Sequence, residues 1–260
     1  MKPILIGIRI KNKSEILPLC LQALAFQSLK KFDIYIYDES DVPITDHYPV
    51  RLAMDLLQIH YKIDIHHQRR IESKNVAQAL IKLLEYTKTK KYEYLLMLDS
   101  DMILTPNCLE ILFKHIKNEE DIAYTEPCVI DINNALGHND YSVEHYNEDD
   151  IKKFSQWGIN HQYYDTYFTL ERTTTTASIP LIQMSLLTYS KLAELMNDLE
   201  KLGKLPGEDI VMYYHLTKGK NKGLLISTAL AYHYSHTESQ RDWYNVSRQI
   251  QEKITKGEFL

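Results

Sequence analysis

The sequence predicts an α/β fold in which a mainly parallel central sheet is flanked by helices. Strand-like, β-branched runs alternate with segments of helical periodicity through the first half of the chain. Residues 92–98 form a nearly continuous apolar run, which is typical of a strand buried on both faces. Because 44% of the 260 residues are hydrophobic, the chain can bury a sizeable core.

The first strand and helix are expected within residues 4–28. Residues 4–10 are rich in isoleucine, and Ser14 then precedes Glu15 in a helix-start pattern. Apolar residues recur at intervals of three and four from 15 to 28, so one helical face should pack on the sheet. A second strand is predicted at 32–37, and it stops at four polar residues, Asp38-Glu39-Ser40-Asp41.

The alternation continues to about residue 118. A short helix is expected at 52–57, a third strand at 61–66 and a helix that opens at Glu72-Ser73. The apolar strand at 92–98 ends in Asp99-Ser100-Asp101, and Pro106 suits the first position of the next helix. Right-handed crossovers between such units build a parallel sheet.

The second half of the chain is less regular. Residues 131–178 are polar and rich in tyrosine, and they are too long for a simple loop, which predicts a functional insertion. A helix is expected at 190–202 because Gly203 marks its end, and Gly207 precedes the next helix. A strand at 224–234 and a helical tail complete a single expected domain, 1–260.

Composition excludes several classes of protein. No stretch approaches the roughly 18 to 20 apolar residues of a membrane span, and the start of the chain leads into a strand rather than a signal peptide, so a cytoplasmic protein is expected. A net charge of −5 gives no overall field for nucleic acid. Cys20, Cys108 and Cys128 lack paired spacing and are expected to be buried free thiols.

Two acidic clusters follow predicted strands, where ligands bind in open α/β sheets. Asp99 and Asp101 stand two residues apart, so their carboxylates can project to one side. Oxygen ligands of this kind suit Mg²⁺ or Mn²⁺ that bridges a diphosphate. Short acidic strings also cap turns and helices, which is the structural alternative for both clusters.

These motifs resemble those of the family 2 glycosyltransferases, which have the GT-A fold. The resemblance covers about residues 3–118 and 179–238 and rests on the acidic strand end at Asp38, the DxD motif at Asp99 and Asp101, and the later Glu208-Asp209. It implies transfer of a sugar from a nucleoside-diphosphate sugar, with UDP favoured by family frequency, to an acceptor hydroxyl with inversion. It also implies that residues 1–125 bind the donor and metal, whereas 126–260 supply the base and the acceptor surface.

The resemblance also implies roles in donor binding. Asp38 would contact the nucleobase, with Glu39 beside it, and Asp101 would bind the metal while Asp99 holds ribose and metal-bound water. The family's glycine-rich lead-in to a donor-facing helix is missing here. The further candidates for donor contacts are Ser100 in the DxD motif and Arg69, Arg70 and Asn75 near that helix.

Four further residues are catalytic or metal-binding candidates by the same resemblance. Asp209 would be the general base that takes the acceptor proton, with Glu208 as second candidate. Acidic residues in a first helical turn are also favoured by the macrodipole, so a capping role is the alternative. One of His233 and His236 would complete the metal site, with His233 favoured by its place in the strand, and a buried structural histidine is the alternative.

Two other functions fit parts of the sequence. A nucleotidyltransferase also holds Mg²⁺ with carboxylates on an α/β sheet, but Gly7 alone does not supply its glycine-rich phosphate loop. A noncatalytic nucleotide- or sugar-binding protein would keep the fold, and the presence of Asp209 favours an enzyme over it. For the acceptor, a lipid-linked glycan, a protein, a small molecule and modified phage DNA all stay open.

Overall fold

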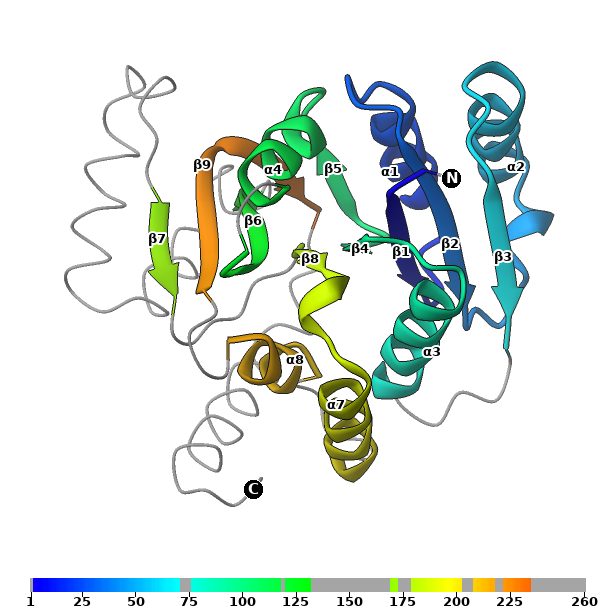
Figure 1. The fold of residues 1–260 in the computed structure, drawn as a ribbon. Coiled ribbons are helices and arrows are strands. Elements are labelled where there is room, and N and C mark those ends of the chain that lie inside the picture. The colour runs from blue at the N-terminus through cyan, green and yellow to red at the C-terminus, as the bar shows by residue number, and fades with distance from the viewer. Residues whose placement is uncertain are drawn as a thin grey trace.

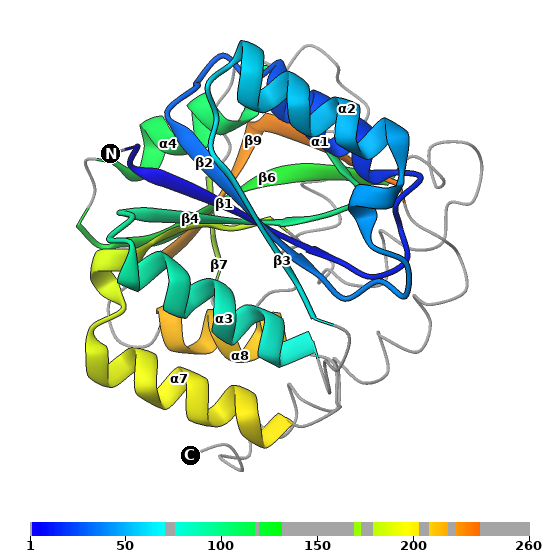
Figure 2. The ribbon, with the colours of Figure 1, turned by 90° about the vertical axis from the view of Figure 1, so that its right-hand side faces the viewer.

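The computed structural model describes residues 2–70, 76–117, 120–131, 169–172, 179–202, 208–217 and 222–234. Its centre is a twisted sheet with helices on both faces (Figures 1 and 2). In chain order the strands are β1 Ile4–Ile10, β2 Phe32–Asp38, β3 Ile65–Arg69, β4 Tyr94–Asp99, β5 Met102–Leu104, β6 Ile122–Asp131, β7 Thr169–Arg172, β8 Leu181–Gln183 and β9 Lys222–His233.

The amino-terminal half of the sheet is parallel. Strands β3, β2, β1 and β4 lie in this order and pair in parallel, so their carboxyl ends meet at one edge. The register aligns Arg9 of β1 with Tyr37 of β2 and with Asp99 of β4. Residues at these three strand ends therefore become neighbours, as the sequence predicts for a ligand site.

The rest of the sheet mixes directions. Strand β8 pairs antiparallel with β4 and β6, and β9 pairs parallel with β6 and antiparallel with β5 and β7. The β5–β9 pairing aligns Met102 with His233, immediately beyond the DxD motif. Strands from both predicted halves of the chain thus belong to one sheet.

The helices form two layers that cover opposite faces of the sheet. Figure 2 shows α1, α2 and α4 on one face and α3, α7 and α8 on the other. The helices are α1 Leu17–Ala25, α2 Tyr48–Asp55, α3 Val76–Thr89, α4 Cys108–Ile116, α7 Tyr189–Leu202 and α8 Glu208–Thr217, with short helical turns at Ile44–Asp46 (η1), Leu56–His60 (η2, a π-turn) and Met184–Leu186 (η4).

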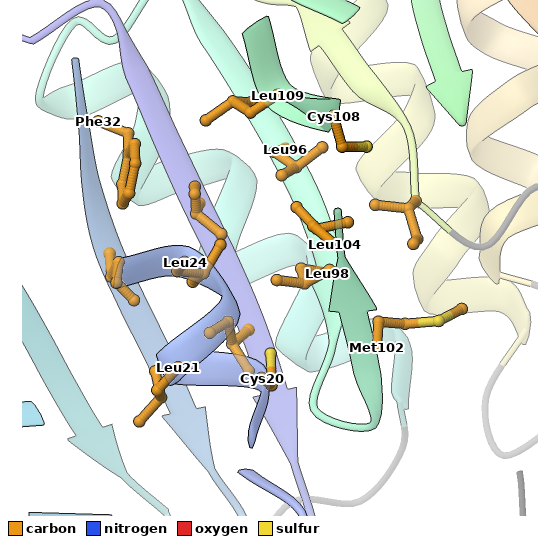
Figure 3. Close-up of a cluster of buried hydrophobic side chains, with 14 of the residues drawn as sticks. Cys20, Leu21, Leu24, Phe32, Leu96, Leu98, Met102, Leu104, Cys108 and Leu109 are labelled. Carbon is orange, nitrogen blue, oxygen red and sulfur yellow. The ribbon is translucent and has the colours of Figure 1, made fainter. Parts of the chain in front are cut away.

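Each helical layer encloses its own hydrophobic core. Between α1, α4 and the sheet, Leu24, Leu96 and Leu104 pack among fully or nearly fully buried neighbours (Figure 3). Cys20 and Cys108 belong to this core, and burial raises the pKa of both thiols. The prediction of buried free thiols is confirmed for these two, whereas the side chain of Cys128 lies outside the described residues.

Several predicted element boundaries are wrong for identifiable reasons. The third strand begins at Ile65 rather than Tyr61, because Lys62 adopts a left-handed backbone with φ of 55°. Lys91 has φ of 59°, and β4 begins at Tyr94. The helix predicted from Thr105 begins at Cys108, and the short helix predicted at 52–57 spans Tyr48–Asp55 before the π-turn.

Other predictions agree with the structure or fall outside it. The helix predicted at 190–202 is confirmed as α7, and the final strand is β9, which extends two residues further towards the amino terminus than expected. Residues 132–168 and 173–178 of the predicted insertion, and the tail from 235 onward, lie outside the described residues. Within the described parts of the chain, every helix is too short or too polar to cross a membrane.

The core assignment can be tested with two leucines of the same helix. Leu24 is completely buried in α1, whereas Leu19 is 46% exposed. We expect Leu24→Ala to lower the free energy of unfolding by about 2–5 kcal/mol, because it removes buried methyl groups and leaves a cavity. Leu19→Ala should change it by about 0.5 kcal/mol or less. Urea denaturation measures both, and equal losses would contradict the assignment.

Candidate functional site

The DxD motif lies at the carboxyl edge of the parallel strands. Asp99 ends β4, Ser100 and Asp101 form the turn, and β5 follows at once. Asp101 is only 4% exposed and Ser100 is buried, whereas the Asp99 side chain is 39% exposed. The two carboxylates therefore have different surroundings, although both lie at the predicted ligand edge.

The pairing of β5 with β9 brings His233 to Asp101. The backbone N–H of Tyr234 donates to the carbonyl oxygen of Asp101 at 3.0 Å, and His233 Nε2 lies 3.5 Å from Asp101 Oδ2. Lys13, from the loop after β1, contacts the same oxygen with Nζ at 2.5 Å. Burial by itself would raise the pKa of Asp101, but the contacts with His233 and Lys13 outweigh it and lower this pKa to about 2.

Asp99 shares a cation with the helix that begins at Glu208. Arg9 Nη2 donates to Asp99 Oδ1 at 3.3 Å, and Arg9 Nη1 donates to Glu208 Oε1 at 2.6 Å. Burial would lower the pKa of Arg9, but the two carboxylates outweigh it and raise this pKa above its ordinary value. Arg9 thus remains charged and joins the ends of β1 and β4 to the start of α8.

The acidic turn after β2 is organised by Asp38. Its carboxylate is fully buried and accepts backbone N–H bonds from Ser40 at 2.9 Å and Ile44 at 3.1 Å. His67 Nε2 of β3 lies 3.1 Å from Asp38 Oδ2. Burial raises the pKa of Asp38, but these hydrogen bonds reverse the effect and leave it below its ordinary value. Asp38 therefore acts as an internal support for the turn.

Asn12 fastens the loop after β1 to the same turn. Its side-chain amide donates to Asp41 Oδ2 and accepts from the Asp41 backbone N–H, each at 2.9 Å. Asn12 has φ of 54°, a left-handed conformation that asparagine tolerates better than most residues. On the other side, Arg69 donates to the carbonyl oxygen of Asp41 at 2.9 Å. The acidic turn is thus held between β1 and β3.

Glu39 differs from its neighbour in having an unused acceptor. Its Oε1 is buried and has no hydrogen-bond partner, and the hydroxyl of Tyr37 two residues earlier is likewise buried and unpartnered. Buried polar atoms without partners are rare in folded proteins, and each one needs an explanation. A ligand that presents an N–H group to Glu39 would supply one.

Three solved structures similar to this chain are glycosyltransferases of low sequence identity. S. aureus TarS matches with a TM-score of 0.58 and 15% identity over 98% of this chain, and GalNAc-T7, solved with UDP, GalNAc and Mn²⁺, matches with 0.62 and 12% over 90%. The mannosyltransferase PcManGT from Pyrobaculum calidifontis, in complex with GDP-Man and Mn²⁺, matches with 0.58 and 10% over 93%. The predicted GT-A fold is confirmed by these likenesses.

The sequence itself matches the profile of glycosyl transferase family 2 over residues 6–176. The chain belongs to glycosyl transferase family 2. A comparison with curated proteins finds no match. This family 2 chain spans 40% of the length of TarS, 43% of GalNAc-T7 and 59% of the mannosyltransferase.

The donor residues predicted from the family resemblance are described only in part. Arg69 ends β3 and Arg70 follows it, at the carboxyl edge of the sheet. The described part of helix α3 starts at Val76, and residues 71–75 before it lie outside the described residues. Asn75 and His236 lie outside the described residues. Asp209 is in the first turn of α8, but its side chain is likewise outside the described part of the structure.

Sequence reasoning missed Arg9 and Lys13, two cationic residues that contact Asp99 and Asp101. A signal for Arg9 was present, because a lone arginine interrupts the apolar run of β1 near its carboxyl end. Charged residues are rarely buried without a partner, so an arginine at this place in a buried strand indicates a carboxylate nearby. Lys13 gave no such signal, since it lies among polar residues that read as an ordinary loop.

The site fits a divalent cation that is coordinated partly by the protein and partly by a bound ligand. Asp101 and His233 converge and supply an ionised carboxylate and an imidazole, which suit Mn²⁺ or Mg²⁺. Among the described residues, no three His, Cys, Asp or Glu side chains gather closely enough to hold a metal unaided. Mg²⁺ sites often use one or two carboxylates together with substrate phosphates, so two protein ligands are sufficient.

The support role of Asp38 predicts a specific pH dependence. Asp38→Asn should lower the free energy of unfolding by about 2–3 kcal/mol at pH 7, because hydrogen bonds to a buried charge are lost. The folded-state pKa is lowered, so this stabilisation is complete above the ordinary value of 3.8 and is lost as the pH falls further.

Urea denaturation between pH 3 and 7 would measure the difference between wild type and Asp38→Asn. The exposed Asp46 in η1 offers a matched control, and Asp46→Asn should have little effect at any pH. A difference for Asp38→Asn that does not narrow below pH 3.8 would contradict the role given to this carboxylate.

Proposed function

We propose that this chain transfers a sugar from a nucleoside-diphosphate sugar to an acceptor hydroxyl with the help of a divalent metal. The observation that carries the proposal is the contact between His233 and Asp101, two residues beyond Asp99, at the carboxyl edge of the sheet in a family 2 chain. Ligands of open α/β sheets bind at this edge. Solved relatives in fold were crystallised with nucleotides or nucleotide sugars, two of them with Mn²⁺, which is consistent with the proposal.

Asp101 and His233 would hold the cation, and Asp99 would face ribose and metal-bound water. A bound Mg²⁺ or Mn²⁺ would stabilise negative charge on the leaving diphosphate. Lys13 reaches Asp101 from a half-exposed position, so its ammonium group can turn towards a phosphate once the carboxylate has another cation. The chain thus supplies positive charge on the side of the site where the leaving group would carry negative charge.

For the nucleobase contact, Glu39 is a better candidate than Asp38. Both oxygens of Asp38 already accept hydrogen bonds inside the protein, whereas Glu39 Oε1 is unpartnered. A uracil or guanine ring carries an N–H group that can donate a hydrogen bond to a carboxylate. We therefore move the base contact from Asp38 to Glu39 and keep Asp38 as the support of the turn. UDP stays the favoured donor by family frequency.

Asp209 is the proposed general base. The Glu208 carboxylate contacts Arg9 and its side chain is only 10% exposed, which argues against the second candidate. In the proposed reaction Asp209 accepts the proton of the acceptor hydroxyl, the oxygen bonds to the anomeric carbon, and the bond from that carbon to the diphosphate breaks. Attack opposite the leaving group inverts the anomeric centre. The acceptor alternatives named from the sequence stay open predictions.

A thermal-shift panel of nucleoside diphosphates and nucleotide sugars, with and without Mn²⁺, tests donor binding. One nucleotide at about 100 times its Kd should stabilise the chain by about 2.7 kcal/mol, a shift of roughly 5–10 °C, only with the metal. Asp101→Ala should abolish the shift, and the exposed control Asp55→Ala on α2 should keep it. A shift that survives in Asp101→Ala would place the donor elsewhere, and no shift with any nucleotide would favour a noncatalytic protein.

The role of the base can be separated from donor binding. Asp209→Asn should lower kcat by about 10²- to 10⁴-fold, because it removes the proton acceptor, while the nucleotide shift with Mn²⁺ is retained. Transfer to an acceptor, or slow hydrolysis of the donor by water, can be followed by release of nucleoside diphosphate. An unchanged kcat would exclude Asp209 as the base, and lost nucleotide binding would reassign it to the donor site.

A further inference from the structure

Arg9 is a charged residue within an otherwise apolar strand. Alternate residues of β1 point to the face that α3 covers, since Leu5 belongs to the core of that side and a side chain at Gly7 would meet Leu83 of α3 at 2.7 Å. Arg9 continues this series at the carboxyl end of the strand, on the same side as Tyr37 and Asp99. Its guanidinium therefore points from the sheet towards the layer that contains α8.

The guanidinium of Arg9 joins two elements that are far apart in the sequence. Its two terminal nitrogens separately contact Asp99 and Glu208, which lie 90 and 199 residues after Arg9 in the sequence. The side chains of Arg9 and Glu208 are 18% and 10% exposed, so the 2.6 Å contact is largely shielded from water. Arginine can span two carboxylates in this way because its donors are fixed in a planar fork, whereas lysine presents a single point charge.

Helix α8 has a polar contact near each end in the described part of the chain. Glu208 opens the helix, and residues 203–207 before it lie outside the described residues. Near the other end, His215 Nε2 lies 2.9 Å from Asp198 Oδ2 of α7. Val211 and Met212, in the middle of α8, belong to the hydrophobic core on this side of the sheet. Apolar packing allows small sliding, so the ion pair at the first residue fixes the end of α8 that leads into Asp209.

We propose that Arg9 is a positioning residue, which fixes the first turn of α8 and the proposed base Asp209 relative to the donor-site carboxylate Asp99. This inference rests on the proposed function, in which Asp209, the second residue of α8, is the general base. Arg9 acts through Glu208 and does not touch the reacting atoms. A displacement of about 1 Å in a catalytic group can cost on the order of 100-fold in rate, so a single buried contact is enough to matter.

The test compares Arg9→Lys, Glu208→Gln and the double variant with wild type. Each single variant should lower kcat on the order of 10- to 100-fold. The KM for the nucleotide sugar should change less than about threefold, since the metal and nucleobase contacts remain. The double variant should be no slower than the slower single variant, because Glu208→Gln changes a contact that Arg9→Lys already breaks. The exposed Arg51 of α2 is a matched control, and Arg51→Lys should match wild type.

Three kinetic results would overturn the inference. A rise in donor KM with unchanged kcat would make Arg9 a direct ligand of the donor. Losses that multiply in the double variant would mean that Arg9 and Glu208 act independently. A matching fall in kcat for Arg51→Lys would show that replacing an exposed arginine by lysine has the same effect, and would remove the special role of the buried pair.

Amide hydrogen exchange tests the same contact without any activity. In Arg9→Lys the amides of α8, residues 208–217, should exchange at least several-fold faster than in wild type, while those of α1 stay unchanged. Unchanged exchange in α8 would contradict the positioning role. If wild type neither binds a nucleotide nor transfers a sugar, the proposed function fails, and the exchange result still decides whether Arg9 holds α8.

Discussion

Compensation of charge at the carboxyl edge of the parallel strands is the constraint on which the site depends. Asp99 and Asp101 are brought together by a buried strand and a tight turn, and Asp101 is almost completely covered. Carboxylates in such surroundings must be paired, because burial of an isolated charge costs several kcal/mol. Arg9 and Lys13, from the end of β1 and the loop behind it, provide the pairing.

The same pairing explains how distant parts of the chain form one site. Strand β5 follows the DxD motif directly and pairs with β9, which places His233 beside Asp101. On the opposite side, the contact between Arg9 and Glu208 brings α8 against the sheet. Contacts with residues 9 and 101 thus place His233 of β9 and Glu208 of α8 at the site. Metal, donor and base would then occupy adjoining positions along a single sheet edge.

Local patterns were sufficient for part of this architecture. Strands β1, β2 and β4 and helix α7 were predicted because each shows its own periodicity and clear end signals. Strands β5 and β8 have three residues each, and β6 contains Pro127 with a register shift after it, so no local pattern identifies them. Their existence depends on pairing with distant strands, which a single sequence does not reveal.

The residues of the candidate site likewise fall into those that the sequence identifies and those that only the folded structure distinguishes. Asp99, Asp101 and His233 were found from spacing and family resemblance, and their neighbourhood follows from parallel and antiparallel register. The choice between Asp38 and Glu39 depends on which carboxylate already accepts hydrogen bonds from the protein, and only the folded turn shows this.

In the proposed reaction a divalent cation held by Asp101 and His233 would bind the diphosphate of the donor. Anomalous diffraction at the manganese edge, from crystals of the chain grown with UDP and Mn²⁺, would locate this cation. We expect a single strong peak within coordination distance of Asp101 and His233, in contact with both phosphates. Nucleotide bound without a metal peak, with Lys13 still on Asp101, would contradict the claim.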